Sequence, residues 1–303
     1  MPRILIGLAF LLFTGSAALA CEERLIEGEG IVKSPVCVPS SAERIVVLDP
    51  TYSLGMSLEL DLPVVGAPLF GMSDEILKEK ALAEGVTDIG AFTEPSIEKV
   101  VALQPDLIIG SGLLAPVYDI ASQIAPTVLI SDENWRDYYA RVGEIAGKSA
   151  DVERLLADLD ERVAGVRARV VDKTVSIVRI TPWDFQVYLD APDAYGPFAV
   201  LRDAGVKRTD YETSTDETTL KRPDWEDIAE LDGDILLYIV GGSNDSAESG
   251  RHEEVIENPL WKMLPAVRSG NVHRVDAATW MEFSGVTSAN RVLDDVERYI
   301  ADQ

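Results

Sequence analysis

Residues 149–170 read SADVERLLADLDERVAGVRARV, and this stretch decides how the chain is organised. Its apolar residues recur at helical spacing between charged ones, which predicts an amphipathic helix with Ser149 as its N-cap. Such a helix would be about 33 Å long, roughly the diameter of a domain. It is either an ordinary long surface helix or a rigid connector between two lobes. The apolar positions are Val152, Leu155, Leu156, Leu159, Val163, Val166 and Val170.

Short apolar runs precede this stretch and alternate with helical segments such as Ser96–Leu103. Unbroken apolar runs are typical of strands that are buried on both faces of a parallel sheet. Residues 21–148 are therefore predicted to form one βα lobe. The expected strands are Arg44–Asp49, Pro63–Gly66, Asp106–Ile109 and Thr127–Ile130.

A second strand and helix series follows the connector, and it ends in a helix from about Ser288 to Ile300. The chain is too long for one comfortable core, so we expect an α/β protein of two lobes. Residues 149–171 would connect the first lobe to a second lobe of residues 172–303. The expected strands are Val175–Ile180, Phe185–Tyr188, Ile235–Val240 and Val272–Val275.

The composition disfavours two classes of function, nucleic-acid binding and metal binding. The chain has 27 Lys and Arg against 52 Asp and Glu, a formal net charge of −25, which disfavours binding to nucleic acid. It has two His and two Cys, too few for a metal site of imidazole or thiolate ligands, so we expect no metal site.

The N-terminus has the layout of a secretory signal peptide. Arg3 precedes the apolar run Ile4–Phe13, and Ala18-Leu19-Ala20 is a candidate cleavage site. Residues 1–20 would therefore be removed, and the exported protein would begin at Cys21.

Cys21 then has two possible fates. It can carry a lipid anchor, although a lipoprotein signal prefers Leu where Ala18 stands, or it can form a disulfide with Cys37 in an oxidising compartment. The two fates exclude each other because lipidation uses the Cys21 sulfur. Pairing is favoured because it leaves no orphan thiol.

Motifs of common enzymes are missing from the sequence. There is no phosphate-binding loop, no dinucleotide fingerprint and no Gly-x-Ser-x-Gly elbow. His252 and His273 lie outside any nucleophile motif, so we interpret both as solvated or structural. We therefore expect a protein that is not an enzyme, with an exported enzyme on a related fold as the competing hypothesis.

The mature chain resembles the substrate-binding proteins of bacterial ATP-driven importers for ferric siderophores, haem and cobalamin. The order and spacing of short motifs over about 260 residues carry this resemblance. It implies two α/β lobes joined by one long helix, a ligand cleft between the lobes, and a periplasmic location. The motifs are Glu43–Asp49, Glu94–Ile109, Ile124–Val128, Trp225–Asp232, Asn258–Trp261, Leu264–Val267, Asn271–Asp276 and Trp280.

The resemblance places the ligand among loops at the carboxyl ends of the strands. Aromatic side chains there would pack the organic rim of a ferric chelate, and arginines would neutralise an anionic complex. Trp135, near the fifth strand, is a further candidate for the cleft. The predicted ligand-binding residues are Tyr52, Phe70, Phe92, Arg179, Trp183, Arg251 and Trp280.

Two departures from the family pattern bear on the ligand. Relatives that resemble catecholate binders have Ser-Gly-Arg where this chain has Ser111-Gly112-Leu113, and Met281 stands where a Tyr often follows the Trp. We therefore favour a ferric siderophore of the hydroxamate or carboxylate type. Haem and cobalamin remain alternatives, although for haem only Tyr52 is placed to act as an axial ligand.

The resemblance also implies partners. Glu98 and Glu226 occupy matching points of the two lobes, where acidic residues of relatives meet arginines on the importer's membrane subunits. Both could instead belong to an acidic surface. We expect a monomer without a cofactor that delivers its ligand to an importer of permease and ATPase subunits.

Overall fold

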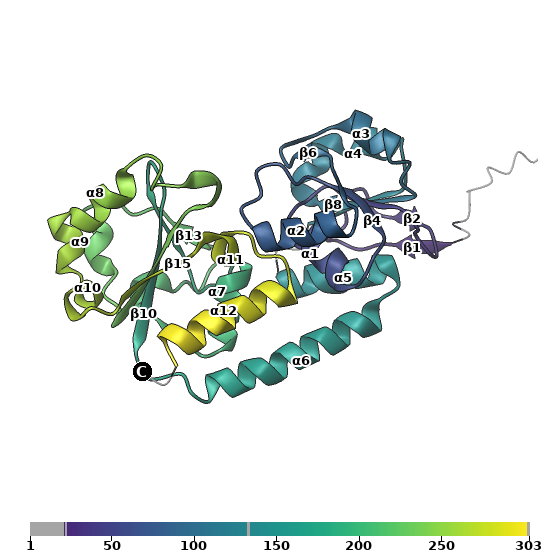
Figure 1. Cartoon of the computed structure of the whole chain (residues 1–303). Helices are drawn as coiled ribbons and strands as arrows, with labels where there is room; N and C mark the ends of the chain where they lie inside the picture. The colour runs from purple at the N-terminus through teal and green to yellow at the C-terminus, as the bar shows by residue number, and fades with distance from the viewer. Residues whose placement is uncertain (1–20, 22, 132–133, 302–303) are drawn as a thin grey trace, which may run out of the picture.

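The chain folds into two α/β lobes side by side, with one long helix running along both (Figure 1). The computed structural model describes residues 21, 23–131 and 134–301. The predicted signal peptide, residues 1–20, lies outside the described residues.

The first lobe is built on a five-stranded sheet in which all neighbouring strands are parallel. All four strands predicted for this lobe are present. The strands, in spatial order, are β5 (Thr87–Asp88), β4 (Val64–Ala67), β3 (Ile45–Val47), β8 (Leu107–Ser111) and β9 (Thr127–Ile130).

The second lobe has a six-stranded mixed sheet. Strands β10, β14 and β15 are parallel, β12 (Lys207–Arg208) pairs with β10 in parallel, and β11 runs antiparallel to both β10 and β13. The main path runs β13 (Leu220–Lys221), β11 (Phe185–Tyr188), β10 (Thr174–Ile180), β14 (Ile235–Val240) and β15 (Val272–Asp276).

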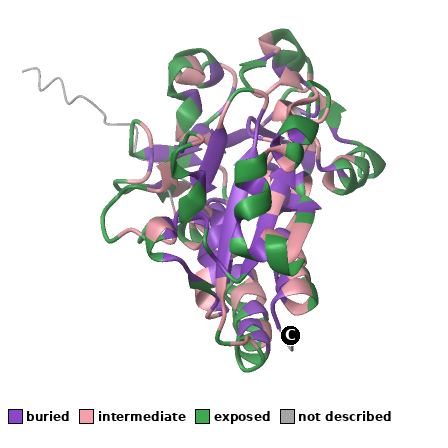
Figure 2. Cartoon of the chain, turned by 90° about the vertical axis from the view of Figure 1, so that its left-hand side faces the viewer, coloured by how far each residue is buried: buried purple, intermediate pink, exposed green. Residues whose placement is uncertain are grey.

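The central strands are mostly apolar because helices cover both faces of each sheet. Val175 and Ile177 of β10 belong to one buried cluster, whereas Val178 and Ile180 belong to another. Successive side chains of a strand point to opposite faces, so alternate residues enter different cores. Figure 2 shows buried residues concentrated in the central strands of the second lobe, with exposed faces on the surrounding helices.

Helices cover the sheets and occupy most of the connections. In the first lobe they are α1 (Tyr52–Glu59), α2 (Glu75–Ala83), α3 (Ile97–Ala102), α4 (Tyr118–Ala121) and α5 (Trp135–Ala146). In the second lobe they are α7 (Gly196–Asp203), α8 (Arg251–Glu257), α9 (Pro259–Met263), α10 (Pro265–Ser269), α11 (Ala277–Met281) and α12 (Val286–Tyr299).

The connecting helix is α6 (Ser149–Arg167), which ends three residues before Val170. Its N-cap is Lys148 and not Ser149, which is the first helical residue and makes no capping bond. The buried stripe of α6 comprises Val152, Leu159, Val163 and Val166, and the helix contacts α5 as well as α7 and α12. The apolar residues of α6 therefore pack this helix against both lobes.

The N-terminal thiols are paired. Cys21 and Cys37 form a disulfide, as predicted, and Cys37 lies within β2 (Val36–Val38), which pairs antiparallel with β1 (Arg24–Ile26). The bond closes a loop with a sequence separation of 16 residues. A lipid on the Cys21 sulfur would be incompatible with this pairing.

The disulfide leads to a first prediction. Replacing Cys37 by Ser should lower the free energy of unfolding by about 3 kcal/mol, because the unfolded chain loses a loop constraint. Denaturant unfolding of the exported protein and of the variant measures this difference. Mass spectrometry should find no reactive thiol before reduction; a diacylglycerol group on Cys21 would contradict the prediction.

Candidate functional site

A cavity of about 760 Å³ lies between the two lobes. Its first wall follows strands β3, β8 and β9, and its second wall comes from the segments after β11, around β13 and at the end of α11. Ligands in α/β proteins bind at such carboxyl ends of strands. The lining residues are Asp49, Pro50, Thr51, Tyr52, Phe92, Ser111, Gly112, Leu113, Ile130, Ser131, Tyr188, Asp193, Tyr195, Thr219, Leu220 and Met281.

Aromatic rings from both lobes meet at this cavity. Tyr52, the first residue of α1, is stacked with Tyr195 of the second lobe at 6.5 Å between ring centroids and 10° between planes. Tyr195 in turn lies 5.9 Å from Tyr188. These rings offer flat apolar faces to an organic ligand.

The two stacked tyrosines are uncharged at neutral pH. Burial raises the pKa of the Tyr52 phenol and of the Tyr195 phenol well above the ordinary value. The Tyr195 hydroxyl also accepts a hydrogen bond from the backbone amide of Phe283 at 3.0 Å. The aromatic part of the wall is therefore neutral.

The polar side chains of the first-lobe wall are held by local hydrogen bonds. Asp49 accepts bonds from the Thr51 amide at 3.1 Å, the Thr51 hydroxyl at 2.8 Å and the Ser53 amide at 2.8 Å. Ser111 accepts a bond from the Leu113 amide at 3.3 Å. Leu113 itself is 78% exposed, so this loop presents an apolar side chain to the cavity.

The predicted ligand residues of the first lobe lie near this cavity. Tyr52 and Phe92 line it, as does Leu113. Phe70, which is 73% exposed, lines a second cavity of about 510 Å³ that also includes Gly242 of the second lobe. That these side chains bind the ligand stays a prediction.

The predicted residues of the second lobe are placed differently. Arg179, Trp183 and Arg251 do not belong to the described wall of either cavity. Trp183 is 63% exposed on the turn between β10 and β11. Arg179 is buried at the end of β10, and the Arg251 guanidinium lies 5.2 Å from the Phe185 ring centroid.

Trp280 does not face the cleft, and the prediction that it does is wrong. The side chain is fully buried, and its Nε1 donates to Asp295 Oδ2 at 2.8 Å. The ring packs edge-on against Phe198. Trp135 is likewise buried in the core, where its ring packs against Phe283. Both tryptophans lie on the buried sides of their helices, α5 and α11, and not on the cavity.

Sequence reasoning missed most of the second wall. Tyr188 ends a strand that the sequence did predict, and Asp193 and Tyr195 lie in the segment that follows it. The rule that singled out the loops of the first lobe concerns the carboxyl ends of parallel strands, and β11 runs antiparallel to β10, so the rule gave no signal for these residues.

The two predicted docking residues are exposed, one on each lobe. Glu98 lies in the first turn of α3, and Glu226 directly precedes the short helix Asp227–Glu230. Neither lines a described cavity. Their role in docking remains a prediction.

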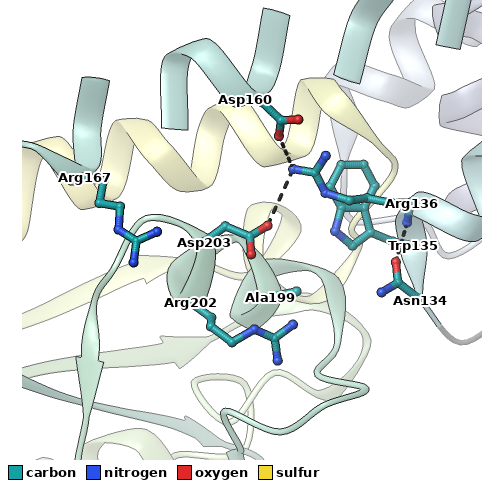
Figure 3. Close-up of a pocket in the computed structure, with 8 residues that line it drawn as sticks. All are labelled: Asn134, Trp135, Arg136, Asp160, Arg167, Ala199, Arg202 and Asp203. Carbon is teal, nitrogen blue, oxygen red and sulfur yellow. Dashed lines mark hydrogen bonds and ion pairs between the residues drawn. The ribbon is translucent and has the colours of Figure 1, made fainter. Parts of the chain in front are cut away.

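A third cavity, of about 410 Å³, lies where α5, α6 and α7 meet (Figure 3). Arg136 of α5 bonds Asp160 of α6 at 2.7 Å and pairs with Asp203 of α7 at 3.5 Å. Figure 3 shows the Arg136 guanidinium pointing between these two carboxylates. Arg136 thus links the first lobe, through α5, to the connecting helix α6 and to α7 of the second lobe.

Two half-buried carboxylates also connect the lobes. Glu59 of the first lobe accepts bonds from the Val286 and Thr287 amides at the start of α12, at 3.2 and 2.6 Å. Glu282 of the second lobe accepts bonds from the Ser73 and Asp74 amides, just before α2, both at 2.8 Å. Glu59 therefore caps the N-terminus of α12, whereas Glu282 binds the backbone that leads into α2.

The described residues offer neither a metal-binding cluster nor a membrane-spanning helix. Among them, no group of three or more His, Cys, Asp and Glu is placed to hold a metal ion. No helix in the same part of the chain combines the length and the apolar character needed to cross a membrane.

Known proteins resemble this chain along most of its length. A family model described as periplasmic binding protein matches residues 45–279. A probable siderophore-binding lipoprotein of Bacillus subtilis (strain 168) is 32% identical over 277 residues, covering 86% of this chain and 83% of the relative. The achromobactin-binding periplasmic protein of Dickeya dadantii (strain 3937) is 32% identical over 72% of this chain and 73% of its own.

The fold is similar to that of solved structures. The crystal structure of Staphylococcus aureus SirA complexed with staphyloferrin B has a TM-score of 0.78 and 22% sequence identity. The similarity covers 92% of this chain and all of the other. The two-lobed α/β architecture predicted from the sequence is confirmed.

Proposed function

Since this chain belongs to the periplasmic binding protein family, we propose that it captures a ferric siderophore and delivers it to an ABC importer. The ligand would bind between an N-terminal lobe of residues 21–148 and a C-terminal lobe of residues 172–303, braced by the helix between them. The protein would act in the periplasm, after export.

The cavity between the lobes is the observation that supports this proposal. It lies at the carboxyl ends of strands β3, β8 and β9 of the first lobe and against residues around β11 and β13 of the second, and stacked tyrosines form part of its wall. Its volume of about 760 Å³ falls within the range of small-molecule sites. Relatives with more than 30% identity are named for siderophore or achromobactin binding.

We propose a hydroxamate or carboxylate siderophore as the ligand class. The apolar Leu113 in the cavity wall offers no positive charge to a tris-catecholate complex. Haem is a weaker candidate, because burial raises the pKa of the Tyr52 phenol and so disfavours the phenolate that binds iron.

The proposal predicts a loss of ligand affinity when side chains of the cavity wall are truncated to alanine. Phe92→Ala and Leu113→Ala should each weaken binding of a ferric siderophore by about 1–3 kcal/mol, because both side chains line the cavity. Tryptophan fluorescence titrations with ferric dicitrate, ferrichrome and ferric enterobactin measure this. The iron-free chelators should cause far less quenching.

Leu260→Ala is the matched control, because Leu260 is also exposed but lies outside the described cavities. It should leave affinity unchanged. Quenching by haemin or cobalamin, with none by any ferric siderophore, would contradict the proposed ligand. Equal affinities of Leu113→Ala and Leu260→Ala would mean that the ligand binds elsewhere.

A further inference from the structure

The charged side chains in the wall of the interlobe cavity are both aspartates. Asp49 accepts three hydrogen bonds from Thr51 and Ser53, so its charge is already shared with local donors. Asp193, which follows β11, is exposed and makes no ion pair or hydrogen bond among the described side chains. Its full charge therefore faces the space where the ligand would lie.

Cations close to this cavity in the sequence are engaged elsewhere. Lys221 follows the wall residue Leu220, but its Nζ donates to the Tyr211 carbonyl at 2.6 Å and lies 4.2 Å from that ring centroid. Arg222 pairs with Asp184. In the first lobe, Lys99 donates to the Asp88 carbonyl at 2.8 Å.

The two arginines predicted to meet an anionic ligand do not line the described wall of this cavity. Arg179 is only 8% exposed, and the Arg251 guanidinium is placed over the Phe185 ring. The described wall of the cavity contains no lysine or arginine, and the whole chain carries −25. An anionic complex would enter against this field without a lysine or arginine in the described wall to meet it.

The rest of the wall suits a ligand without charge. Tyr52, Tyr188, Tyr195 and Phe92 provide ring faces, and Ser111, Ser131 and Thr219 provide hydroxyl groups. A chelate whose iron charge is cancelled by its own donor groups can pack against such a surface without a counter-ion.

We propose that the cavity selects ferric siderophores with no net negative charge, and that Asp193 determines this specificity. This inference rests on the proposed function and narrows its ligand class. The favoured ligands are neutral tris-hydroxamate complexes and those with a free ammonium group, which Asp193 would attract. Carboxylate complexes such as ferric dicitrate and trianionic tris-catecholates are disfavoured.

Affinities for four complexes test this inference. Calorimetric titrations should rank ferrioxamine B, a cation, and ferrichrome, which is neutral, above ferric dicitrate and ferric enterobactin, which are anions. The advantage of ferrioxamine B over ferrichrome should shrink as sodium chloride rises from about 0.1 M to 1 M, because salt screens exposed charges.

Variants of Asp193 assign the effect to this residue. Asp193→Asn should reduce the preference for ferrioxamine B over ferrichrome about twofold to fivefold, as for an exposed charge pair. Asp193→Lys should reverse it and raise affinity for ferric dicitrate about tenfold. Asp158→Asn is the control: Asp158 is exposed on α6, outside the cavity, and its replacement changes the net charge equally.

Three outcomes would overturn the inference. Tightest binding of an anionic complex by the unaltered protein would overturn it and leave the proposed function intact. Equal effects of Asp193→Asn and Asp158→Asn would remove Asp193 as the specificity residue. Failure of all four complexes to bind would overturn the proposed function, and this inference with it.

Discussion

Replacing both Glu98 and Glu226 by lysine should abolish uptake of the ferric ligand while leaving its affinity for the binding protein unchanged. Both glutamates are exposed, one on each lobe, and neither lines a described cavity. Exposed substitutions usually change stability by within about 0.5 kcal/mol, so the variant should fold normally. Charge reversal would place lysines against the cationic docking sites that we propose on the importer.

The measurement is ligand-stimulated ATP hydrolysis by the reconstituted importer, together with uptake of radioactive iron by cells. A matched control replaces Glu153 and Glu161 by lysine. Both are exposed on α6, which runs along the side of the molecule away from α3 (Figure 1). Normal transport by the variant with both replacements would contradict a docking role, and Glu98 and Glu226 would then simply be part of the acidic surface.

Glu212→Ala should lower the free energy of unfolding by about 3–5 kcal/mol, as expected when one partner of a buried ion pair is removed. Glu212 is fully buried and accepts bonds from Arg208 at 2.7 Å, the Ile177 amide at 2.7 Å and the Thr209 hydroxyl at 3.0 Å. Its loss leaves a buried guanidinium that also holds the carbonyl of Tyr188, a cavity residue.

Denaturant unfolding of the variant measures this loss. Glu257→Ala is the control, since Glu257 also pairs with a cation, Lys262 at 2.6 Å, but on the surface. Its effect should be much smaller, because solvent already screens that pair. Similar unfolding midpoints for the two variants would contradict the argument that burial makes the Glu212 network important for stability.

The strands and the connecting helix were predictable because their signals are local. An unbroken apolar run such as Ile45–Val47 indicates a strand that is buried on both faces. The spacing of apolar residues in 149–170 indicates a helix with one apolar stripe. Helix ends were less certain: the structure starts α6 after Lys148 and ends it at Arg167. Competing terminal hydrogen bonds decide such ends within a residue or two.

The lining of the interlobe cavity was predicted in part. Position after a strand correctly brought Tyr52 and Phe92 to the cavity. The same rule does not say whether a ring turns outward or inward, so Trp280 was misplaced: its bond to Asp295, on α12, holds it in the core. Tyr195 and Asp193 were missed because their importance depends on the opposite lobe.

Local pattern and composition were enough to predict the two sets of strands, the helix between them, the acidic surface and the family. The side chains that face each other across the lobes became known only from the folded chain. The stacking of Tyr52 with Tyr195 and the capping of α12 by Glu59 join residues more than 140 positions apart. No local pattern encodes such pairs, because they arise from the packing of one lobe against the other.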